Sequence, residues 1–190
     1  MKKRIAIFAS GSGSNAQKII EHFKKNDHAE VAIVISNRAD AYVLERADNF
    51  EIPTHIIFRE TFYGSDDTLK LLEQLKIDLI VLAGFLWLVP ENLIQAYPKR
   101  IVNIHPGLLP KFGGKGMYGH HVHDAVLKAK EAESGITIHF VNEEFDAGEI
   151  IFQAKCKVEK KDTPELLAFR VQQLEYLYFP KTVESVVKKL

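Results

Sequence analysis

The feature that most constrains the fold is a regular alternation between short apolar runs and segments with the period of a helix. Runs rich in Ile, Val, Leu and Phe, which predict buried strands, cover residues 4–10, 31–37, 54–58, 78–85 and 100–106. Segments with the spacing of amphipathic helices cover residues 16–25, 41–50, 65–75 and 90–97. Strands that are apolar on both faces and joined through helices form parallel sheets covered on both sides. The chain is therefore expected to be an α/β protein with a mostly parallel sheet and helices on both faces.

The pattern changes after residue 105. Residues 107–119 hold five glycines and no periodicity, which predicts a long loop, and residues 122–130 predict a helix. The runs 135–141 and 149–158 predict two more strands, expected to form an antiparallel extension. From Thr163 the sequence T-P-E-L begins a long helix of about 27 residues, which Pro180 is expected to break or kink. Without repeats or a shift in composition, residues 1–190 are expected to form one domain.

The charge balance and the cysteine content bear on the expected partners and cellular location of the protein. The chain carries 25 basic and 25 acidic residues, so no electrostatic argument favours nucleic acid or a membrane surface as a partner. No apolar run reaches the length of a membrane span. Cys156 is the single cysteine, which fits a reducing compartment. A cytoplasmic location is therefore expected, with no nucleic-acid or membrane partner.

A glycine-rich turn, GSGSN at residues 11–15, follows the first strand and opens the first helix. Glycine permits a close backbone approach, and a helix N-terminus offers unpaired N–H groups to an anion. Gly11, Gly13 and Ala16 also satisfy the dinucleotide spacing G-x-G-x-x-A, but the second strand ends in Ser-Asn-Arg without the acid that an NAD site needs. Arg38 leaves an NADP site open, and a turn without a ligand is a further alternative. The hydroxyl of Ser14 and the amide of Asn15 favour a phosphate monoester.

An amide and an imidazole, Asn103 and His105, end the fifth strand. Residues i and i+2 of a strand share a face, and the carboxyl ends of parallel strands are where ligands bind in open sheets. Asp146, in the turn between the last two strands, is expected to reach the same edge. An amide and an imidazole can stabilise an oxyanion, and a nearby carboxylate raises the pKa of the imidazole. Direct acyl transfer between two bound substrates is therefore favoured, although Asn103 and His105 also suit a purely structural role.

Three histidines, His120, His121 and His123, invite comparison with a metal site. Their spacing matches no common zinc signature and no cysteine is near. A solvated loop and helix start is favoured, with His123 as the member that faces the site. No metal is expected.

Six motifs together resemble a known family: GSGSN, LAGF at 82–85, NIHPGLLP at 103–110, GITIHFV at 135–141, DAGEI at 146–150 and RVQQLE at 170–175. In this order, from Arg4 to about Pro180, they are similar to the phosphoribosylglycinamide formyltransferases, folate-dependent enzymes of purine biosynthesis. The resemblance implies a Rossmann-like fold and transfer of the formyl group of 10-formyl-tetrahydrofolate, a co-substrate, to the amine of glycinamide ribonucleotide. It also implies a phosphate-binding half at about 1–100 and a catalytic and folate-binding half at about 101–190.

The resemblance assigns roles to individual residues. Asn103, His105 and Asp146 would be catalytic, with His105 held protonated by Asp146. The ribose phosphate would contact Gly13, Ser14, Asn15, Gln172 and Glu175. The folate would contact Leu86, Trp87, Leu88, Val89, Asn103, Asn142, Glu143, Glu144, Phe145 and Asp146. Some relatives carry an arginine where Trp87 stands and another near Ser65, so folate contacts are expected to differ here, with Arg59 as one substitute.

Three alternatives stay open. A formyl-tetrahydrofolate hydrolase shares the Asn–His–Asp trio but is expected to carry an additional N-terminal domain. A methionyl-tRNA formyltransferase is expected to carry a C-terminal domain and a basic surface. A nucleotide-binding module, NADP-dependent or not, explains the glycine turn and leaves the trio without a role. The partners expected are small molecules, and the chain is expected to be a monomer or a weak homodimer.

Overall fold

A single mixed sheet organises the chain. The structure, a computed structural model, describes residues 2–190. The strands are β1 (Lys3–Ala9), β2 (Ala29–Ser36), β3 (Thr54–Ile56), β4 (Leu79–Leu82), β5 (Ile101–His105), β6 (Glu133–Phe140) and β7 (Ile150–Lys157). Their order is β3-β2-β1-β4-β5-β6-β7. The first five run parallel, and β6 and β7 are antiparallel to their neighbours. The expected mostly parallel α/β sheet with an antiparallel extension is confirmed.

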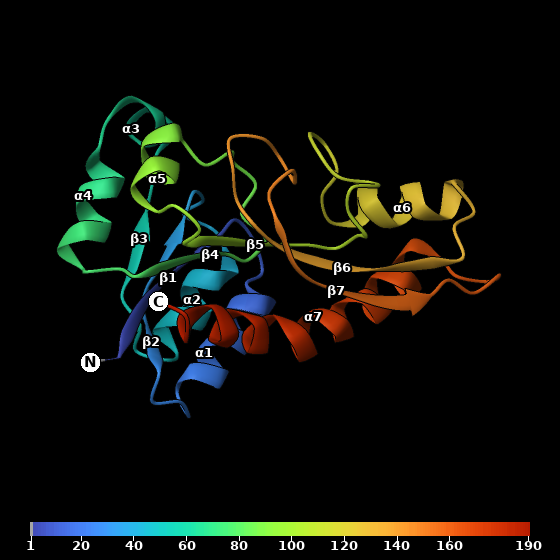
Figure 1. The fold of residues 1–190 in the computed structure, drawn as a ribbon, viewed down its shortest axis with the longest axis horizontal. Helices are drawn as coiled ribbons and strands as arrows, with labels where there is room; N and C mark the ends of the chain where they lie inside the picture. The colour runs from blue at the N-terminus through green and yellow to red at the C-terminus, as the bar shows by residue number, and fades with distance from the viewer. Residues whose placement is uncertain (1) are drawn as a thin grey trace.

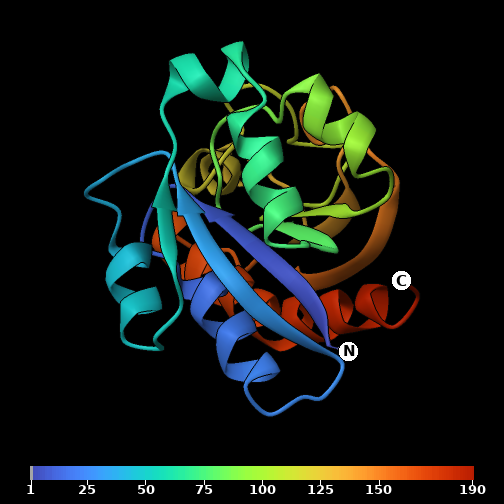
Figure 2. The ribbon, with the colours of Figure 1, turned by 90° about the vertical axis from the view of Figure 1, so that its left-hand side faces the viewer.

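Helices cover both faces of the sheet (Figure 1). They are α1 (Ser14–Phe23), α2 (Tyr42–Asp48), α3 (Arg59–Gly64), α4 (Asp67–Gln74), α5 (Glu91–Ala96), α6 (His120–Lys128) and α7 (Pro164–Val187). One core joins α1, α2 and α7 to the sheet, and a second joins α3, α4 and α5 to the opposite face. The end view in Figure 2 shows these two layers on either side of the twisted strands. No helix among residues 2–190 is both long and apolar enough to cross a membrane.

The apolar spacing of the helices explains which face each one buries. In α1, the buried residues Ala16, Ile19, Ile20 and Phe23 recur at intervals of three and four, so they form one stripe against the sheet. β1, β2 and β4 are buried on both faces, as parallel central strands are. The two cores are therefore built from local periodicity that the sequence displays.

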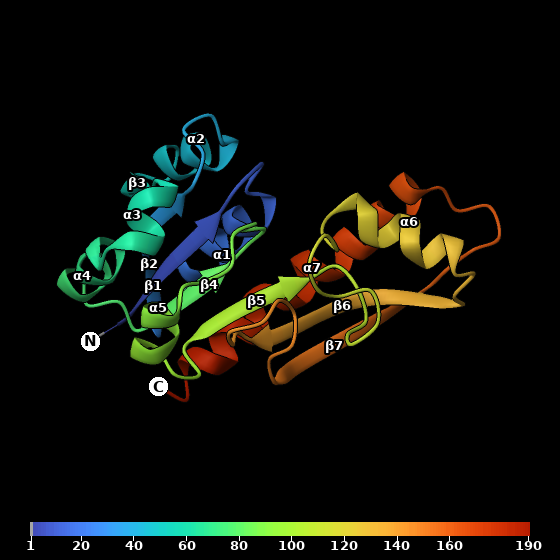
Figure 3. The same cartoon turned by 90° about the horizontal axis from the view of Figure 1, so that it is seen from above.

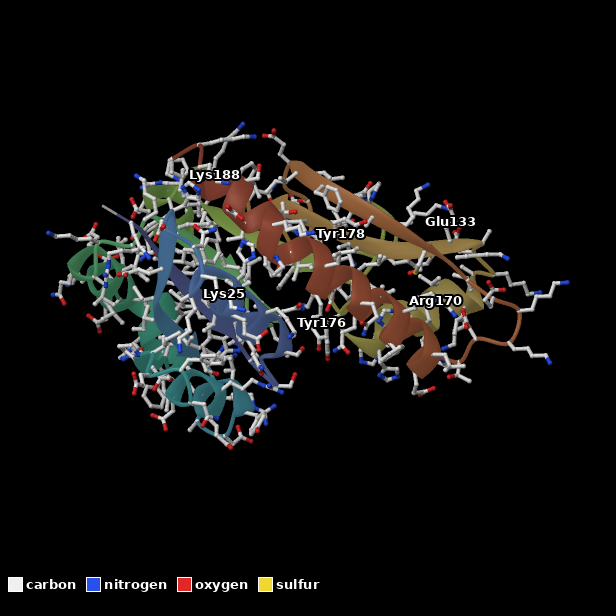
Figure 4. The ribbon with its side chains drawn as sticks, turned by 90° about the horizontal axis from the view of Figure 1, so that it is seen from below. Lys25, Glu133, Arg170, Tyr176, Tyr178 and Lys188 are labelled. Carbon is white, nitrogen blue, oxygen red and sulfur yellow. The ribbon has the colours of Figure 1, made fainter. Side chains whose placement is uncertain are left out.

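The long C-terminal helix α7 runs from Pro164 to Val187 with Pro180 inside it, so of the expected break or kink at this proline, the break is wrong. Figure 4 shows α7, with Arg170, Tyr176 and Tyr178, crossing the lower face between α1 and the strands β6 and β7. Pro180 is itself buried in this packing. Burial on both sides of the proline stabilises the helix beyond what propensity alone allows. The start is as expected, because the Thr163 hydroxyl accepts a hydrogen bond from the N–H of Leu166.

Two local differences from the expected pattern occur on the face covered by α3, α4 and α5. The short helix α3 (Arg59–Gly64) was not expected, because its six residues contribute a single buried side chain, Phe62, and therefore show no periodicity. Pro90 precedes α5 as its N-cap in an extended conformation, whereas the expected helical segment of residues 90–97 began at this proline. Neither difference changes the sheet.

The order of the strands indicates where on the sheet a ligand would bind. From β1 the chain moves outward through β2 and β3, then returns to β4 on the other side of β1. The carboxyl ends of β1 and β4 therefore mark the point where the strand order reverses, and open α/β sheets bind ligands in the crevice outside such a point. The view from above in Figure 3 shows the chain leaving β4 and β5 at this edge, with the segments before α6 lying close by.

Candidate active site

A cavity of about 720 Å³ opens at this edge. Its walls come from five segments: residues 11–15 after β1, 82–89 from the end of β4 onward, 103–106 at the end of β5, 114–120 and 123 around the start of α6, and 139, 141 and 144–146 at and after the end of β6. Ala168, Val171, Gln172 and Glu175 of α7 complete it. A volume of this size is ordinary for a small-molecule site. Of the expected site residues, only Asn142 and Glu143 do not line it. The expected folate contact of these two residues stays a prediction.

The glycine turn presents backbone donors at the cavity wall. Gly13 is the N-cap of α1 with φ of 72°, in the left-handed region that favours glycine. Among the described residues, no acceptor pairs with the N–H groups of Ser12, Gly13, Ser14 and Asn15. Unpaired N–H groups and the positive end of the helix dipole make this turn suitable for an anion.

Asn15 links the glycine turn to α7. Its amide nitrogen donates to Glu175 Oε2 at 2.8 Å, while its Oδ1 is buried without a partner among the described residues. Burial raises the pKa of the Glu175 carboxyl, and the Asn15 bond opposes that shift only partly. Gln172 lies one turn earlier on the same wall. Glu175 is thus a carboxyl that can accept from or donate to a neutral polar group such as a ribose hydroxyl.

Asn103 is held by His139, a residue that sequence reasoning missed. The two are directly opposite in the antiparallel pairing of β5 and β6. Asn103 Nδ2 lies 3.1 Å from His139 Nε2, and His139 Nδ1 lies 2.8 Å from the carbonyl oxygen of Phe140. A carbonyl only accepts, so Nδ1 carries a proton and donates it to Phe140, while Nε2 faces the Asn103 amide and lies 3.6 Å from Asp146 Oδ1. The second N–H of Asn103 faces Asp146 Oδ1 at 3.4 Å, a long contact.

His105 is buried, with an oxygen acceptor on each side of its ring. Nε2 lies 2.8 Å from the Phe112 carbonyl, and Nδ1 lies 3.4 Å from Asp146 Oδ2. Burial lowers the pKa of His105 below its ordinary value, although the charge of Asp146 and the bond to Phe112 oppose this. This direction runs against the expectation of a His105 held protonated by Asp146, because desolvation of the ring outweighs the charge of the carboxylate.

Asp146 joins the two polar side chains of β5. Burial opposes its ionisation, but the contacts with His139 and His105 and the N–H of Gly114, 3.0 Å from Oδ2, hold the pKa of the carboxyl below its usual value. Asp146 has φ of 55°, a conformation uncommon outside glycine that aims its side chain back at the strand. The geometry thus gives an ionised carboxylate beside a neutral imidazole that it can stabilise once protonated.

The loop after β5 is fixed by Thr137, which is fully buried on β6. Its hydroxyl donates to the Gly107 carbonyl at 2.7 Å and accepts from the N–H of Leu109 at 3.0 Å. Because this loop continues to Phe112, whose carbonyl receives His105 Nε2–H, the anchoring by Thr137 also fixes the imidazole. Two members of the Asn103–His105–Asp146 trio are therefore held by backbone groups: His105 by the Phe112 carbonyl and Asp146 by the N–H of Gly114.

An apolar wall faces the polar groups. Leu86, Trp87, Leu88 and Val89 line the cavity, as do Glu144 and Phe145. Trp87 packs against an aromatic cluster, with ring centroids 5.7 Å from Phe62 and 6.1 Å from Tyr63, and the Arg59 guanidinium lies 5.8 Å from its ring. The Tyr63 hydroxyl donates to the Leu88 carbonyl at 3.0 Å, which fixes this wall. A flat aromatic or heterocyclic group could pack here.

Asn142 supports the wall without lining it. Its Oδ1 accepts a hydrogen bond from the N–H of Glu144 at 3.2 Å, which shapes the loop that carries Glu144 to Asp146. Its expected contact with the folate stays a prediction, and the structure shows its side chain bonded within the turn.

The histidines near α6 do not form a metal site. His120 and His123 line the cavity, while His120 also contacts Asp124 at 3.3 Å. Burial lowers the pKa of His123, and the nearby His120 and His105 lower it further. Across residues 2–190, no group of three His, Cys, Asp or Glu side chains could hold a metal ion.

Arg38, which kept an NADP site open, is engaged elsewhere. Its guanidinium donates to both oxygens of Asp40, at 3.1 and 2.8 Å, and it does not line the cavity. Its pKa is raised by this pairing. An arginine already paired with a carboxylate is a poor partner for a 2′-phosphate, so the structure gives the NADP alternative no support.

Three comparisons with known proteins indicate the same enzyme family. The family model described as formyl transferase matches residues 3–183. The chain is 41% identical to the chloroplastic phosphoribosylglycinamide formyltransferase of Arabidopsis thaliana, over 99% of this chain and 66% of that protein, so it spans just under two thirds of that relative's length. It is 37% identical to the phosphoribosylglycinamide formyltransferase of Bacillus subtilis, over 99% and 94% of the two chains. The crystal structure of the Anaplasma phagocytophilum enzyme of that name superimposes with a TM-score of 0.90 at 34% identity, covering 99% and 88%.

Proposed function

The chain belongs to the formyl transferase family, and we propose that it transfers the formyl group of 10-formyl-tetrahydrofolate to the amine of phosphoribosylglycinamide in purine biosynthesis. The observation that carries this proposal is the meeting of three groups around one cavity: the free N–H groups of the glycine turn, the Asn103–His105–Asp146 trio and the apolar wall of Leu86 to Val89. These three parts correspond to a phosphate, a reacting formyl group and a pterin ring.

The two substrates are proposed to enter from opposite faces of the sheet. Ala16, next to the glycine turn, and Val171, in α7, belong to the core on one face of the sheet. Phe85 and Val89, in the segment after β4, belong to the core on the opposite face. The strand end with Asn103 and His105 lies between the two faces. A ribose phosphate on Gly13, Ser14, Asn15, Gln172 and Glu175 and a folate on Leu86 to Val89 and Glu144 to Asp146 would therefore meet at the trio. The two halves of the chain, about 1–100 and 101–190, act as one domain in this proposal.

Asn103 is proposed to stabilise the oxyanion. The attacking amine forms a bond to the formyl carbon, and the carbonyl oxygen gains negative charge. Of the two N–H groups of the Asn103 amide, the one that faces Asp146 at 3.4 Å is the more weakly bonded. It can therefore donate to the developing oxyanion while the other N–H stays bonded to His139. A donor placed in this way contributes on the order of 10²–10³ in rate.

His105 is proposed to move the proton. The ring is neutral before the reaction, with Nε2–H bound to Phe112 and Nδ1 beside Asp146. Nδ1 takes the proton that the attacking nitrogen loses, and Asp146 stabilises the resulting imidazolium. The proton then passes to the folate nitrogen as its bond to the formyl carbon breaks, which restores the neutral ring. General acid–base assistance of this kind is typically worth 10²–10⁴ in rate.

The proposal is tested by the identity of the product. The protein is incubated with both substrates, and the ribonucleotide is analysed by mass spectrometry. Replacement of one amine hydrogen by a formyl group is the expected result, and formate with unchanged ribonucleotide would indicate the hydrolase instead. Cytoplasmic location and a monomer or weak homodimer stay predictions, which cell fractionation and analytical ultracentrifugation measure.

A further inference from the structure

The helix α2 lies directly behind the glycine turn and holds its backbone. The N–H of Val43 donates to the Gly11 carbonyl at 3.1 Å, and Arg46 Nε donates to the Ser12 carbonyl at 2.7 Å. Gly13 lies so close to α2 that an added Cβ would fall 2.8 Å from Val43 Cα. In the described part of the chain, no residue of α2 lines the cavity. Two consecutive carbonyls of the turn are therefore held on the side away from the cavity.

This arrangement fixes where the N–H groups of the turn point. The peptide bonds here are trans, and in a trans peptide the C=O and the N–H point in opposite directions. Because the carbonyls of Gly11 and Ser12 face α2, the N–H groups of Ser12 and Gly13 face away from it, where both residues line the cavity. Successive N–H groups aimed at one point form an anion-binding concavity.

The positive charge of Arg46 is not neutralised by an acid. Its contacts are the Ser12 carbonyl, the side-chain oxygen of Gln17 and the face of the Tyr42 ring, 4.8 Å from the guanidinium carbon. Among residues 2–190, no carboxylate pairs with Arg46 in a salt bridge. Lys115, from the distant loop before α6, is the one lysine or arginine in the described cavity lining. Arg46 therefore places a full positive charge, not paired with an acid, directly behind the glycine turn.

We infer that Arg46 is a positioning residue for the substrate phosphate. Its guanidinium holds the Ser12 peptide so that the N–H groups of the turn converge on the phosphate, and its charge acts on the dianion through the turn without touching it. This inference rests on the proposed function for the identity of the phosphate ester, while the binding of an anion can be measured separately.

The test compares Arg46→Gln, Arg46→Lys and Arg38→Gln. Arg38 is a matched control, because its removal changes the net charge equally at the end of the neighbouring strand, its side chain is 57% exposed, and it lies outside the cavity lining. Two quantities are measured for each variant: the Kd of inorganic phosphate, without substrates, and the KM of the ribonucleotide, of its dephosphorylated riboside and of the formyl folate.

For Arg46→Gln, both the phosphate Kd and the ribonucleotide KM should rise about tenfold, as expected when a hydrogen bond from a charged donor is lost. The KM of the riboside and of the folate should stay within about twofold, since neither uses the anion site. Arg46→Lys keeps the charge but cannot reach both Ser12 and Gln17, so its phosphate Kd and ribonucleotide KM should lie between those of the wild type and of Arg46→Gln. If Arg46→Gln does not fold, the comparison of Arg46→Lys with the wild type replaces it. Arg38→Gln should match the wild type.

Unchanged phosphate affinity in Arg46→Gln and Arg46→Lys, or an equal rise in the KM of riboside and ribonucleotide, would overturn the inference. If transfer to the ribonucleotide is not observed at all, the proposed function fails, and the phosphate Kd alone still decides whether Arg46 organises an anion site.

Discussion

The Nδ1 of His105 lies 3.4 Å from Asp146 Oδ2, in a pocket where the imidazole is almost fully buried. Burial lowers the pKa of this histidine more than the charge of Asp146 raises it, and the carboxylate lies where it can stabilise the ring once protonated. The proton can therefore be taken up and released during a single reaction, which is what transfer between two nitrogens requires.

Replacing Asp146 with Asn should remove the charge that supports the imidazolium, so the pKa of His105 should fall further. At low pH the ring is protonated in both proteins and the difference is small. At about pH 8 turnover depends on how well the site stabilises the imidazolium, and the loss should reach on the order of 10²-fold. The pH–rate profile measures this, with Glu149→Gln as the control, because Glu149 is exposed and pairs with Lys99 outside the site. A loss that is the same at every pH would remove Asp146 from the proton path.

The contact between Asn103 and His139 predicts that the two residues act as a unit. Asn103→Ala should lower kcat by on the order of 10²–10³, because an oxyanion donor is lost. His139→Ala leaves the Asn103 amide without its acceptor and should lower kcat by about tenfold. In the Asn103→Ala background, the second change should add little. Additive losses in this double-mutant cycle would mean that His139 acts independently of Asn103.

The left-handed backbone at Gly13 predicts a position-specific cost in stability. Gly13→Ala forces a non-glycine residue to φ of 72° and drives its methyl group into Val43, which should lower the free energy of unfolding by about 1–3 kcal/mol. Gly11→Ala is the control, since nothing lies within 4 Å of a Cβ at that position. Urea denaturation of both variants measures the difference. Equal midpoints would show that the turn can relax away from α2.

A charge cluster far from the cavity predicts a pH dependence of stability. The bond to Lys188, together with those to His22 and Asn26, outweighs burial and lowers the pKa of Glu184 to about 2. Its folded pKa is below the unfolded value, so its contribution is fully present above about pH 4.5 and is lost as pH falls toward 2. Glu184→Gln should therefore cost on the order of 1–2 kcal/mol at neutral pH, allowing for solvent screening, and nearly nothing near pH 2. Thermal unfolding at both pH values checks this, and an equal cost at each would exclude ionisation as its source.

The parts of the fold predictable from the sequence are those set by local pattern. The apolar runs and the helical periods predicted the parallel sheet, and the i, i+2 spacing predicted a shared face for Asn103 and His105. His139 was missed because its role depends on the pairing of β6 with β5, a contact between strands about thirty-six positions apart in sequence. A histidine within an otherwise apolar strand was the available signal.

The other differences between the sequence-based expectations and the structure arise from burial and packing. The sequence gives the charge of Asp146 but not the desolvation of His105, so the lowered pKa of the imidazole runs against the sequence-based expectation. Pro180 was expected to interrupt α7, but the packing that buries it was not visible in the sequence. Arg46 carried no motif, because its contact with Ser12 exists only once α2 has packed behind the glycine turn.

The most direct test of formyl transfer is the dependence of tetrahydrofolate release on the second substrate. The protein is given 10-formyl-tetrahydrofolate with and without phosphoribosylglycinamide, and the absorbance of tetrahydrofolate is followed. Release that requires the ribonucleotide, and that Asn103→Ala reduces on the order of 10²–10³-fold, is the result expected for direct transfer at the trio. Release at the same rate without the ribonucleotide, or none with it, would contradict the account.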